Sequence, residues 1–338
     1  MLIITGGGGF IGSVLAAQLN EAGRSDLVLV DRFGTGDKWR NIAKRDFYEI
    51  VPVDSLFEWL DRFGGAVETV FHLGAISETT FADADEIIRS NLNYSIALWR
   101  WCAAQRKKFI YASSAATYGD GSAGFGDTGG IAALKRLRPL NLYGWSKHAF
   151  DLWAMRQAEA GNAPPLWAGL KFFNVFGPNE HHKGDMMSLV VKNYPRILAG
   201  ETIPLFKSYC PDYADGEQLR DFVYVKDCAA ALLWLWRHEP NDGPDDPPGA
   251  PISGIYNLGT GQARSFLDLI RALGAACGVA PKIEFVDMPD AIRPNYQYFT
   301  QAEMTRLRRA GYNAAFTPLE DAVRDCVTRY LAQPDPYL

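Results

Sequence analysis

The stretch Leu2-Ile3-Ile4-Thr5-Gly6-Gly7-Gly8-Gly9-Phe10-Ile11-Gly12 opens the chain and places Gly6, Gly9 and Gly12 at three-residue intervals. An apolar run precedes the glycines, and Ile11–Leu19 after them has the apolar spacing of a helix. Glycines let the backbone turn tightly and approach a pyrophosphate, to which a helix N-terminus offers unpaired N–H groups. The stretch therefore predicts a strand, a dinucleotide-binding turn and a helix; the alternative is a glycine turn without a ligand.

The alternation of strand and helix continues beyond this unit. Apolar runs at Leu27–Val30, Thr69–Leu73 and Lys108–Ser113 are separated by helical stretches, which is typical of βαβ units stacked into a parallel sheet. We predict an α/β fold, a doubly wound (Rossmann) sheet over residues 1–170, with residues 221–240 returning to it.

The composition changes after about residue 170, where Pro and Tyr become more frequent and the expected strands are less regular. Strands are expected at Thr202–Phe206 and Ile283–Val286, and helices at Phe266–Cys277 and Glu303–Ala310. Residues 171–220 and 241–338 are assigned to a smaller mixed α/β lobe that binds the substrate. Pro240–Pro251 is rich in Pro, Gly and Asp, which predicts a surface loop.

Composition narrows the classes of function. The 338 residues are 48% hydrophobic and 22% charged, which excludes a disordered or fibrous chain. A net charge of -5 gives no general attraction for nucleic acid, so an acidic ligand needs a few placed cations. Five scattered cysteines without a CxxC pair, no export signal and no apolar run long enough to span a bilayer predict a soluble, cytoplasmic protein.

Charged residues follow the second predicted strand. Asp31 ends it about 20 residues after the glycines, where a carboxylate accepts hydrogen bonds from an adenosine ribose. Arg32 and Lys38 come next, and two cations there would neutralise a 2′-phosphate. This favours NADP over NAD, although a solvated loop would also carry such cations.

A tyrosine and a lysine stand four residues apart in Tyr143-Gly144-Trp145-Ser146-Lys147, which places both on one helix face. The charge of Lys147 is expected to lower the pKa of the Tyr143 phenol and make it a general base. Ser113 and Ser114 end a predicted strand at the sheet edge where ligands of such folds bind. A serine there could share a substrate proton with the tyrosine; chance spacing and strand-end capping are the alternatives.

Together these motifs resemble the extended short-chain dehydrogenase/reductase superfamily, and the resemblance covers nearly the whole chain. Phe172–Pro178, Arg220–Asp227 and Tyr256–Gly261 are similar to stretches of its nucleotide-sugar epimerases and dehydratases. Ser113–Gly119, Glu180–Gly184 and Phe299–Glu303 resemble one group among them, the ADP-L-glycero-D-manno-heptose 6-epimerases. The segment Asp120–Leu140 departs from the family pattern.

The resemblance implies a catalytic set and a second proton donor. Ser114, Tyr143 and Lys147 would act on one face of the sugar and Lys183 on the other, with His182 as the alternative to Lys183. The chemistry independently calls for two groups, because an epimerase removes a hydride from one face of a carbon and returns it to the other. Two adjacent histidines without further ligand spacing do not make a metal site, so no metal is expected.

Further site residues are implied by the same resemblance. Besides the three glycines, Asp31, Arg32, Lys38, Tyr143 and Lys147, the cofactor would contact Phe10, Ile11, Asp54, Leu73, Gly74, Ala75, Ser77, Asn91 and Val175. The substrate, besides Ser114 and Lys183, would contact Asn174, Asp185, Lys192, Phe206, Lys207, Ser208, Tyr209, Arg220 and Tyr296. Arg220 suits a diphosphate because its guanidinium forms two parallel hydrogen bonds to phosphate, unless it simply pairs with Asp221 or Asp227.

The implied activity is epimerisation at C6″ of ADP-D-glycero-D-manno-heptose, with tightly bound NADP regenerated in each cycle, for synthesis of the lipopolysaccharide inner core by a homo-oligomer, a pentamer by resemblance. Two alternatives stay open. One is another enzyme on this scaffold, such as a UDP-sugar 4-epimerase or a 4,6-dehydratase, although Ala115 and Ala116 stand where a dehydratase would have an acidic pair. The other is a cofactor-sensing binding protein that has lost catalysis.

Overall fold

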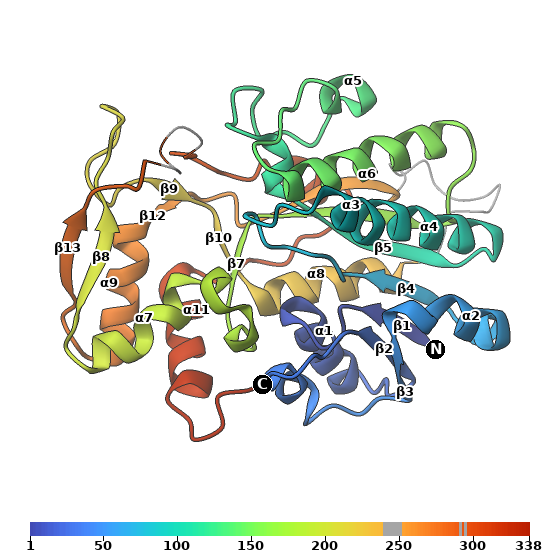
Figure 1. The fold of residues 1–338 in the computed structure, drawn as a ribbon, viewed down its shortest axis with the longest axis horizontal. Coiled ribbons are helices and arrows are strands. Elements are labelled where there is room, and N and C mark those ends of the chain that lie inside the picture. Colours follow the sequence, from blue (N-terminus) through green and yellow to red (C-terminus); the bar gives the residue numbers. More distant parts are fainter. Residues whose placement is uncertain (239–251, 291–292, 294–295) are drawn as a thin grey trace.

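The structure is a computed structural model, and it describes residues 1–238, 252–290, 293 and 296–338 (Figure 1). The expected surface loop Pro240–Pro251 lies outside the described residues. A seven-stranded parallel sheet forms the centre, in the order β11-β6-β5-β4-β1-β2-β3. Its strands are β1 (Leu2–Thr5), β2 (Leu27–Asp31), β3 (Glu49–Pro52), β4 (Thr69–His72), β5 (Lys108–Ser114), β6 (Trp167–Phe172) and β11 (Gly254–Leu258).

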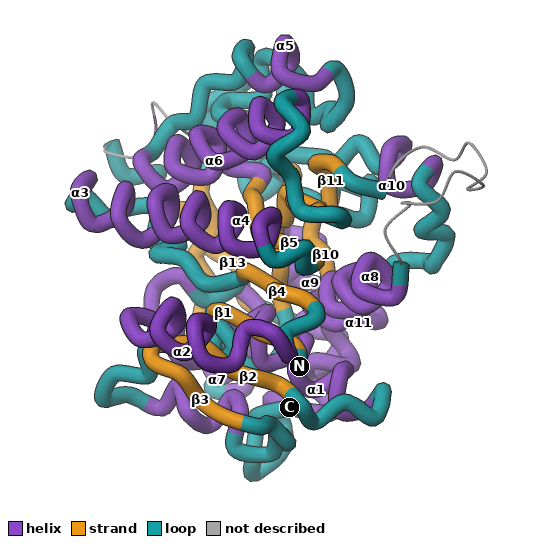
Figure 2. Tube along the Cα trace, turned by 90° about the vertical axis from the view of Figure 1, so that its right-hand side faces the viewer, coloured by secondary structure: helices purple, strands orange, loops and turns teal. Residues whose placement is uncertain are grey.

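Helices cover both faces of this sheet, as Figure 2 shows. One face carries α1 (Phe10–Glu21) and α8 (Val225–Arg237); the other carries α2 (Leu56–Phe63), α3 (Ala84–Ile87), α4 (Tyr94–Ala104) and α6 (Leu142–Glu159). Helix α11 (Leu319–Cys326) packs instead on α9 (Phe266–Cys277). Burial from both sides explains why the strands are continuously apolar: Leu2–Ile4 and Leu27–Val30 have no exposed surface. The doubly wound α/β prediction is confirmed.

A smaller lobe lies beside the sheet (Figure 1). It contains α7 (Leu189–Leu198), α9 (Phe266–Cys277) and the parallel pair of β8 (Thr202–Phe206) with β13 (Lys282–Val286). Two further short pairs join β7 (Asn174–Phe176) to β10 (Phe222–Tyr224) and β9 (Leu219–Arg220) to β12 (Arg264–Ser265). The helix expected at Glu303–Ala310 is shorter, α10 (Thr305–Arg309), and α5 (Gly130–Leu134) lies within the segment that departs from the family pattern.

Two segments after residue 220 pack with the large sheet, and only the first, within residues 221–240, was expected to do so. Helix α8 packs on α1, and Gln18 Nε2 donates to the Lys226 carbonyl at 2.9 Å. Strand β11 pairs with β6 at the edge of the large sheet, so Gly254–Leu258 does not belong to the smaller lobe to which residues 241–338 were assigned. Among the described residues no helix is long and apolar enough to cross a bilayer.

Candidate active site

The glycine turn between β1 and α1 is built to hold an anion. A Cβ atom on Gly12 would lie 2.1 Å from the Gly6 carbonyl oxygen, and Gly6 itself has a φ of 69° and packs on the backbone of Gly74. Helix α1 follows Gly9, and no side chain caps its N-terminus. The first N–H groups of the helix can therefore face a pyrophosphate, and the residues present fit a dinucleotide.

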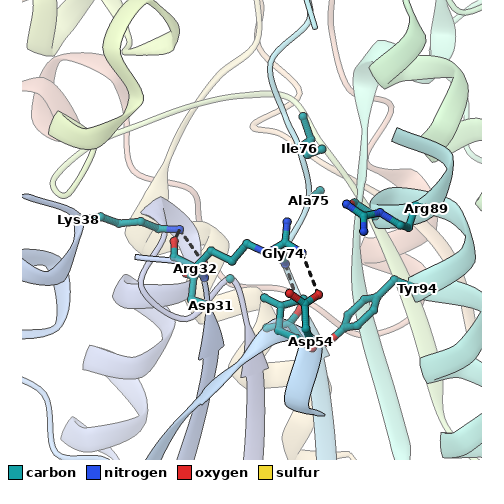
Figure 3. Close-up of a pocket in the computed structure, with 13 residues that line it drawn as sticks. Asp31, Arg32, Lys38, Asp54, Gly74, Ala75, Ile76, Arg89 and Tyr94 are labelled. Carbon is teal, nitrogen blue, oxygen red and sulfur yellow. Dashed lines mark hydrogen bonds and ion pairs between the residues drawn. The ribbon is translucent and has the colours of Figure 1, made fainter. Parts of the chain in front are cut away.

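Cations surround the adjoining cavity beyond the end of β2. Asp31 accepts hydrogen bonds from the Gly8 N–H at 2.8 Å and from Lys38 Nζ at 2.6 Å, while Arg32 donates to Asp54 at 2.9 Å. Figure 3 shows Lys38 and Arg89 on opposite sides of this cavity with Arg32 between them. The Asp31 carboxylate is thus already bonded within the chain, and three cationic groups border the space next to it.

Ser114 and Tyr143 meet where β5 ends and α6 begins. Asn141 caps α6 by accepting from the Gly144 N–H at 2.8 Å, and a Cβ on Gly144 would lie only 2.7 Å from the Ala116 carbonyl oxygen. This close approach brings Tyr143 within hydrogen-bonding reach of Ser114. Burial raises the pKa of the Tyr143 phenol, and the hydrogen bond with Ser114 opposes that rise.

Lys147 lies one helical turn after Tyr143 and is buried, with Nζ donating to the Ala112 carbonyl at 2.9 Å. Burial lowers the pKa of Lys147 to about 8, and Asp151 partly offsets the effect. The expected lowering of the Tyr143 pKa by Lys147 is not found, because burial outweighs the other influences on the phenol. Lys147 nevertheless borders the same cavity as Tyr143, as the helical spacing predicts.

The two serines at the end of β5 have different surroundings. Ser113 is buried and donates to Asp151 at 2.7 Å, and Asp151 also forms an ion pair of 2.6 Å with buried Lys171. Ser114 borders both the cofactor cavity, which the glycine turn lines, and a further cavity next to it, which Asn174 and Phe266 line. Ser114 is therefore placed to meet a substrate. Ser113 borders the cofactor cavity alone, and its hydroxyl is bonded into a buried polar network.

The cavities form one cleft because they share lining residues. Gly6, Asp31 and Lys38 border both the cavity beyond the end of β2 and the cofactor cavity. Ser114, Tyr143 and Lys183 border both the cofactor cavity and a third cavity of about 390 Å³. The wall of the third is completed by residues of the smaller lobe and the segments next to it, among them Asn174, Val175, Met187, Phe222, Phe266, Gln297 and Thr300. A ligand extending from the glycine turn would reach Tyr143 and Lys183 before entering this third cavity.

His182 and Lys183 are adjacent in sequence but serve different parts of the cleft. His182 borders only the cofactor cavity, with Nδ1 at 3.1 Å from Asn41 Nδ2. Burial and the neighbouring Lys38 and Lys183 lower the pKa of His182 to about 4, so its ring is neutral at neutral pH. This favours Lys183 over His182 as the second proton donor.

Arg220 is almost fully buried and does not itself line the third cavity, although Phe266, which it contacts, does. Its guanidinium stacks on Phe266 and Tyr296, with centroid distances of 5.3 and 5.2 Å. Asp221 accepts instead from Thr260, Gly261 and Ala302, and Asp227 accepts from Thr317, so Arg220 has no carboxylate partner in the described part of the chain. The alternative of an ion pair with these aspartates is therefore wrong, and a buried unpaired cation favours an anionic ligand.

Comparisons with known proteins agree with this geometry. Residues 2–259 match the model of a family described as "NAD dependent epimerase/dehydratase family". The chain belongs to that family. It is 46% identical over 340 residues, covering 100% of both chains, to a Nitratidesulfovibrio vulgaris protein named ADP-L-glycero-D-manno-heptose-6-epimerase.

Two further relatives carry the same name. A Fusobacterium nucleatum protein is 44% identical over 346 residues, again covering 100% of both chains. The crystal structure of the Helicobacter pylori protein has a TM-score of 0.76 and 26% identity, covering 97% of this chain and 95% of that one. The resemblance to the extended short-chain dehydrogenase/reductases is thereby confirmed, and the cofactor of the family is a nicotinamide dinucleotide.

Some residues expected to bind ligands in this epimerase/dehydratase family member do not border the cleft. Asn91 is buried behind the wall, where it bonds both the N–H and the carbonyl of Ile76, so its contribution to the cofactor site is indirect. Asp185 and Lys192 contact each other away from the cavities. Lys207 and Tyr209 both bond Asp287, and Ser208 bonds the Cys210 carbonyl.

Other residues border the cleft without having been predicted. Arg89 and Tyr94 line the cavity beyond the end of β2, and Gln297 and Thr300 line the third cavity. The Thr300 hydroxyl is buried and has no partner among the described residues. Thr300 belongs to the Phe299–Glu303 motif, but nothing in that motif points to the cleft. The other three positions lie outside the motifs and reach the cleft only through packing between distant segments.

Proposed function

We propose that this family member interconverts ADP-D-glycero- and ADP-L-glycero-D-manno-heptose at C6″, with NADP as its cofactor. The observation that carries the proposal is that Tyr143 and Lys183, from two separate parts of the fold, border the same two cavities. Full-length identity to proteins of that name supports the choice of substrate. The product places the enzyme in lipopolysaccharide inner-core synthesis.

The chain would supply binding and proton transfer. When bound, the nicotinamide accepts a hydride from the carbon and returns it. The phenolate form of Tyr143, bonded to Ser114, would take the proton of the 6″-hydroxyl in one orientation of the sugar, which leaves a ketone. In the other orientation Lys183 would give a proton to the oxygen of that ketone, and Asn174 would contact the sugar hydroxyls. Arg220 would hold the diphosphate, since its charge has no partner in the described chain.

Proton NMR tests the reaction directly. Purified protein with ADP-D-glycero-D-manno-heptose and no added cofactor should form the L-glycero epimer with retained cofactor. Tyr143→Phe should keep the cofactor and lose about 100-fold or more in turnover. No conversion with NADP or NAD supplied, but conversion of a UDP-sugar, would favour the 4-epimerase alternative; unchanged biological activity of Tyr143→Phe would favour a sensor.

The cofactor preference has its own test. Lys38→Met should weaken NADP binding about tenfold or more, because one charge-assisted hydrogen bond to a 2′-phosphate is lost, and leave NAD binding within about threefold. Equilibrium titration of cofactor-stripped protein measures both. Equal losses for the two cofactors would assign Lys38 to the Asp31 ion pair alone. The proposed homo-oligomer is tested separately by light scattering of the intact protein.

A further inference from the structure

The loop between β7 and α7 carries Lys183 and is organised around one buried carboxylate. Glu180 has no exposed surface. Its Oε1 accepts from the Gly177 N–H at 3.0 Å and its Oε2 from the Ser188 N–H at 2.8 Å, so it joins the two ends of the loop. Lys183 Nζ lies 3.2 Å from the same Oε2.

Lys183 is held from a second side. Its ammonium lies 4.7 Å from the ring centroid of Phe10, at the start of helix α1 beside the glycine turn. The Lys183 side chain is 22% exposed, and it borders both the cofactor cavity and the third cavity. The ion pair with Glu180 and the contact with the Phe10 ring thus fix the flexible Lys183 side chain at the place where the two cavities join.

The charge of Glu180 matters for this arrangement. A buried carboxylate needs compensation, and Lys183 is the one cation within ion-pair distance of it in the described part of the chain. Glutamine would keep the size of the side chain, but it has a single oxygen. In one orientation its amide N–H₂ would face the Ser188 N–H and Lys183, and in the other it would face the Gly177 N–H. All three groups are donors, so either orientation sets donor against donor.

We propose that Glu180 is the positioning residue of Lys183, the group that serves the second orientation of the sugar; this rests on the proposed function. Glu180 touches neither cavity. It acts by holding the ammonium of Lys183 at the reacting oxygen, and a misplacement of about 1 Å in such a group costs up to about 100-fold in rate.

A double-mutant cycle tests the proposal on the whole protein with its retained cofactor. Glu180→Gln should lower kcat about 10- to 100-fold with KM within about threefold. In a Lys183→Met background the same change should cost less than about twofold, because the group it positions is gone. Asp227→Asn, which removes another partly buried carboxylate that bonds a loop N–H, at Thr317, is the control and should leave kcat unchanged in both backgrounds.

The outcomes separate the inference from the function beneath it. Equal losses of kcat from Glu180→Gln in both backgrounds would overturn the positioning role. They would show that Glu180 only holds the two ends of the loop together. Full turnover of Lys183→Met would overturn the role of Lys183 in the proposed function, and the inference with it. Full turnover of Glu180→Gln beside an inactive Lys183→Met would overturn the inference alone.

A chemical measurement covers the case in which Glu180→Gln does not fold. Glu180→Asp keeps the charge one methylene further from Lys183 and serves as the second variant. Reductive methylation followed by peptide mass spectrometry should modify Lys183 severalfold faster in either variant than in the parent protein, relative to exposed Lys135. An unchanged ratio would overturn the proposal without reference to activity.

Discussion

At the scale of single residues, burial shifts the pKa values of the proposed catalytic groups more than their neighbours do. Tyr143 and Lys147 stand one helical turn apart, yet burial raises the pKa of the phenol and lowers that of the ammonium to about 8. Both shifts favour the neutral form. Binding of an anionic cofactor beside Lys147 would favour its charged form again, so ligand binding and proton transfer are linked here.

The shift at Lys147 predicts a change of stability with pH. The folded-state pKa of about 8 lies below the unfolded value of 10.5, so the folded protein binds fewer protons between these values and gains stability as pH rises through them. The gain in the free energy of unfolding of the cofactor-stripped protein is about 3 kcal/mol at most. Urea unfolding at several pH values should show this rise relative to Lys147→Met; parallel curves for the two proteins would contradict the assignment.

At the scale of elements, the position of α6 depends on close backbone packing. Gly144 faces the Ala116 carbonyl, which belongs to the short helix that Ser114 caps. Asn141 and Gly144 therefore place the first turn of α6, and with it Tyr143, against the end of β5. The four-residue spacing places Tyr143 and Lys147 on one face of α6. The contact of Gly144 with Ala116 decides which way that face points.

Gly144→Ala is expected to separate the two elements. Its Cβ would need to move the backbone carbonyl of Ala116, since the distance would be 2.7 Å. We expect a fall in kcat of about tenfold or more from the displaced Tyr143, with cofactor binding less affected. Gly65→Ala is the control, because nothing lies within 4 Å of its added methyl group. Steady-state kinetics of both variants decides; equal activities would contradict the role of the contact.

At the scale of the whole molecule, the last residues of the chain join the two sides of the cleft. Tyr337 packs on His181 at 5.2 Å, and its carbonyl accepts from Lys44 Nζ at 2.7 Å. The Leu338 N–H donates to Asn179 at 2.9 Å. Residues 335–338 thus connect the segment after β2, which carries Lys38, with the loop that carries Lys183.

The Tyr337 ring contacts both His181 and the Arg40 guanidinium, the latter at 5.9 Å, so removing the ring should loosen both segments together. Tyr337→Ala is expected to speed amide hydrogen exchange in residues 37–44 and 177–188, with little change in the sheet strands β1 and β4. Mass spectrometry of peptides from the exchanged protein measures this. Faster exchange in only one segment would show that residues 335–338 do not couple them. Tyr48→Ala, which removes an exposed aromatic just before β3, is the control.

The order of residues along the chain is sufficient for the features that depend on local geometry. Strand, glycine turn and helix at the start follow from apolar periodicity and from backbone freedom, and the Tyr143–Lys147 face follows from the 3.6-residue turn. The resemblance of motifs extends this to the family, the reaction and the position of Lys183.

Tertiary packing decided what depends on burial and on contacts between distant segments. The direction of the Tyr143 pKa shift, the unpaired charge of Arg220 and the place of β11 in the large sheet are such properties. Glu180 is the sharpest case, since in the sequence it is a carboxylate three residues before a lysine, as on many surface loops. Only the fold removes it from water and leaves Lys183 to balance its charge, because desolvation is a property of the whole packed molecule.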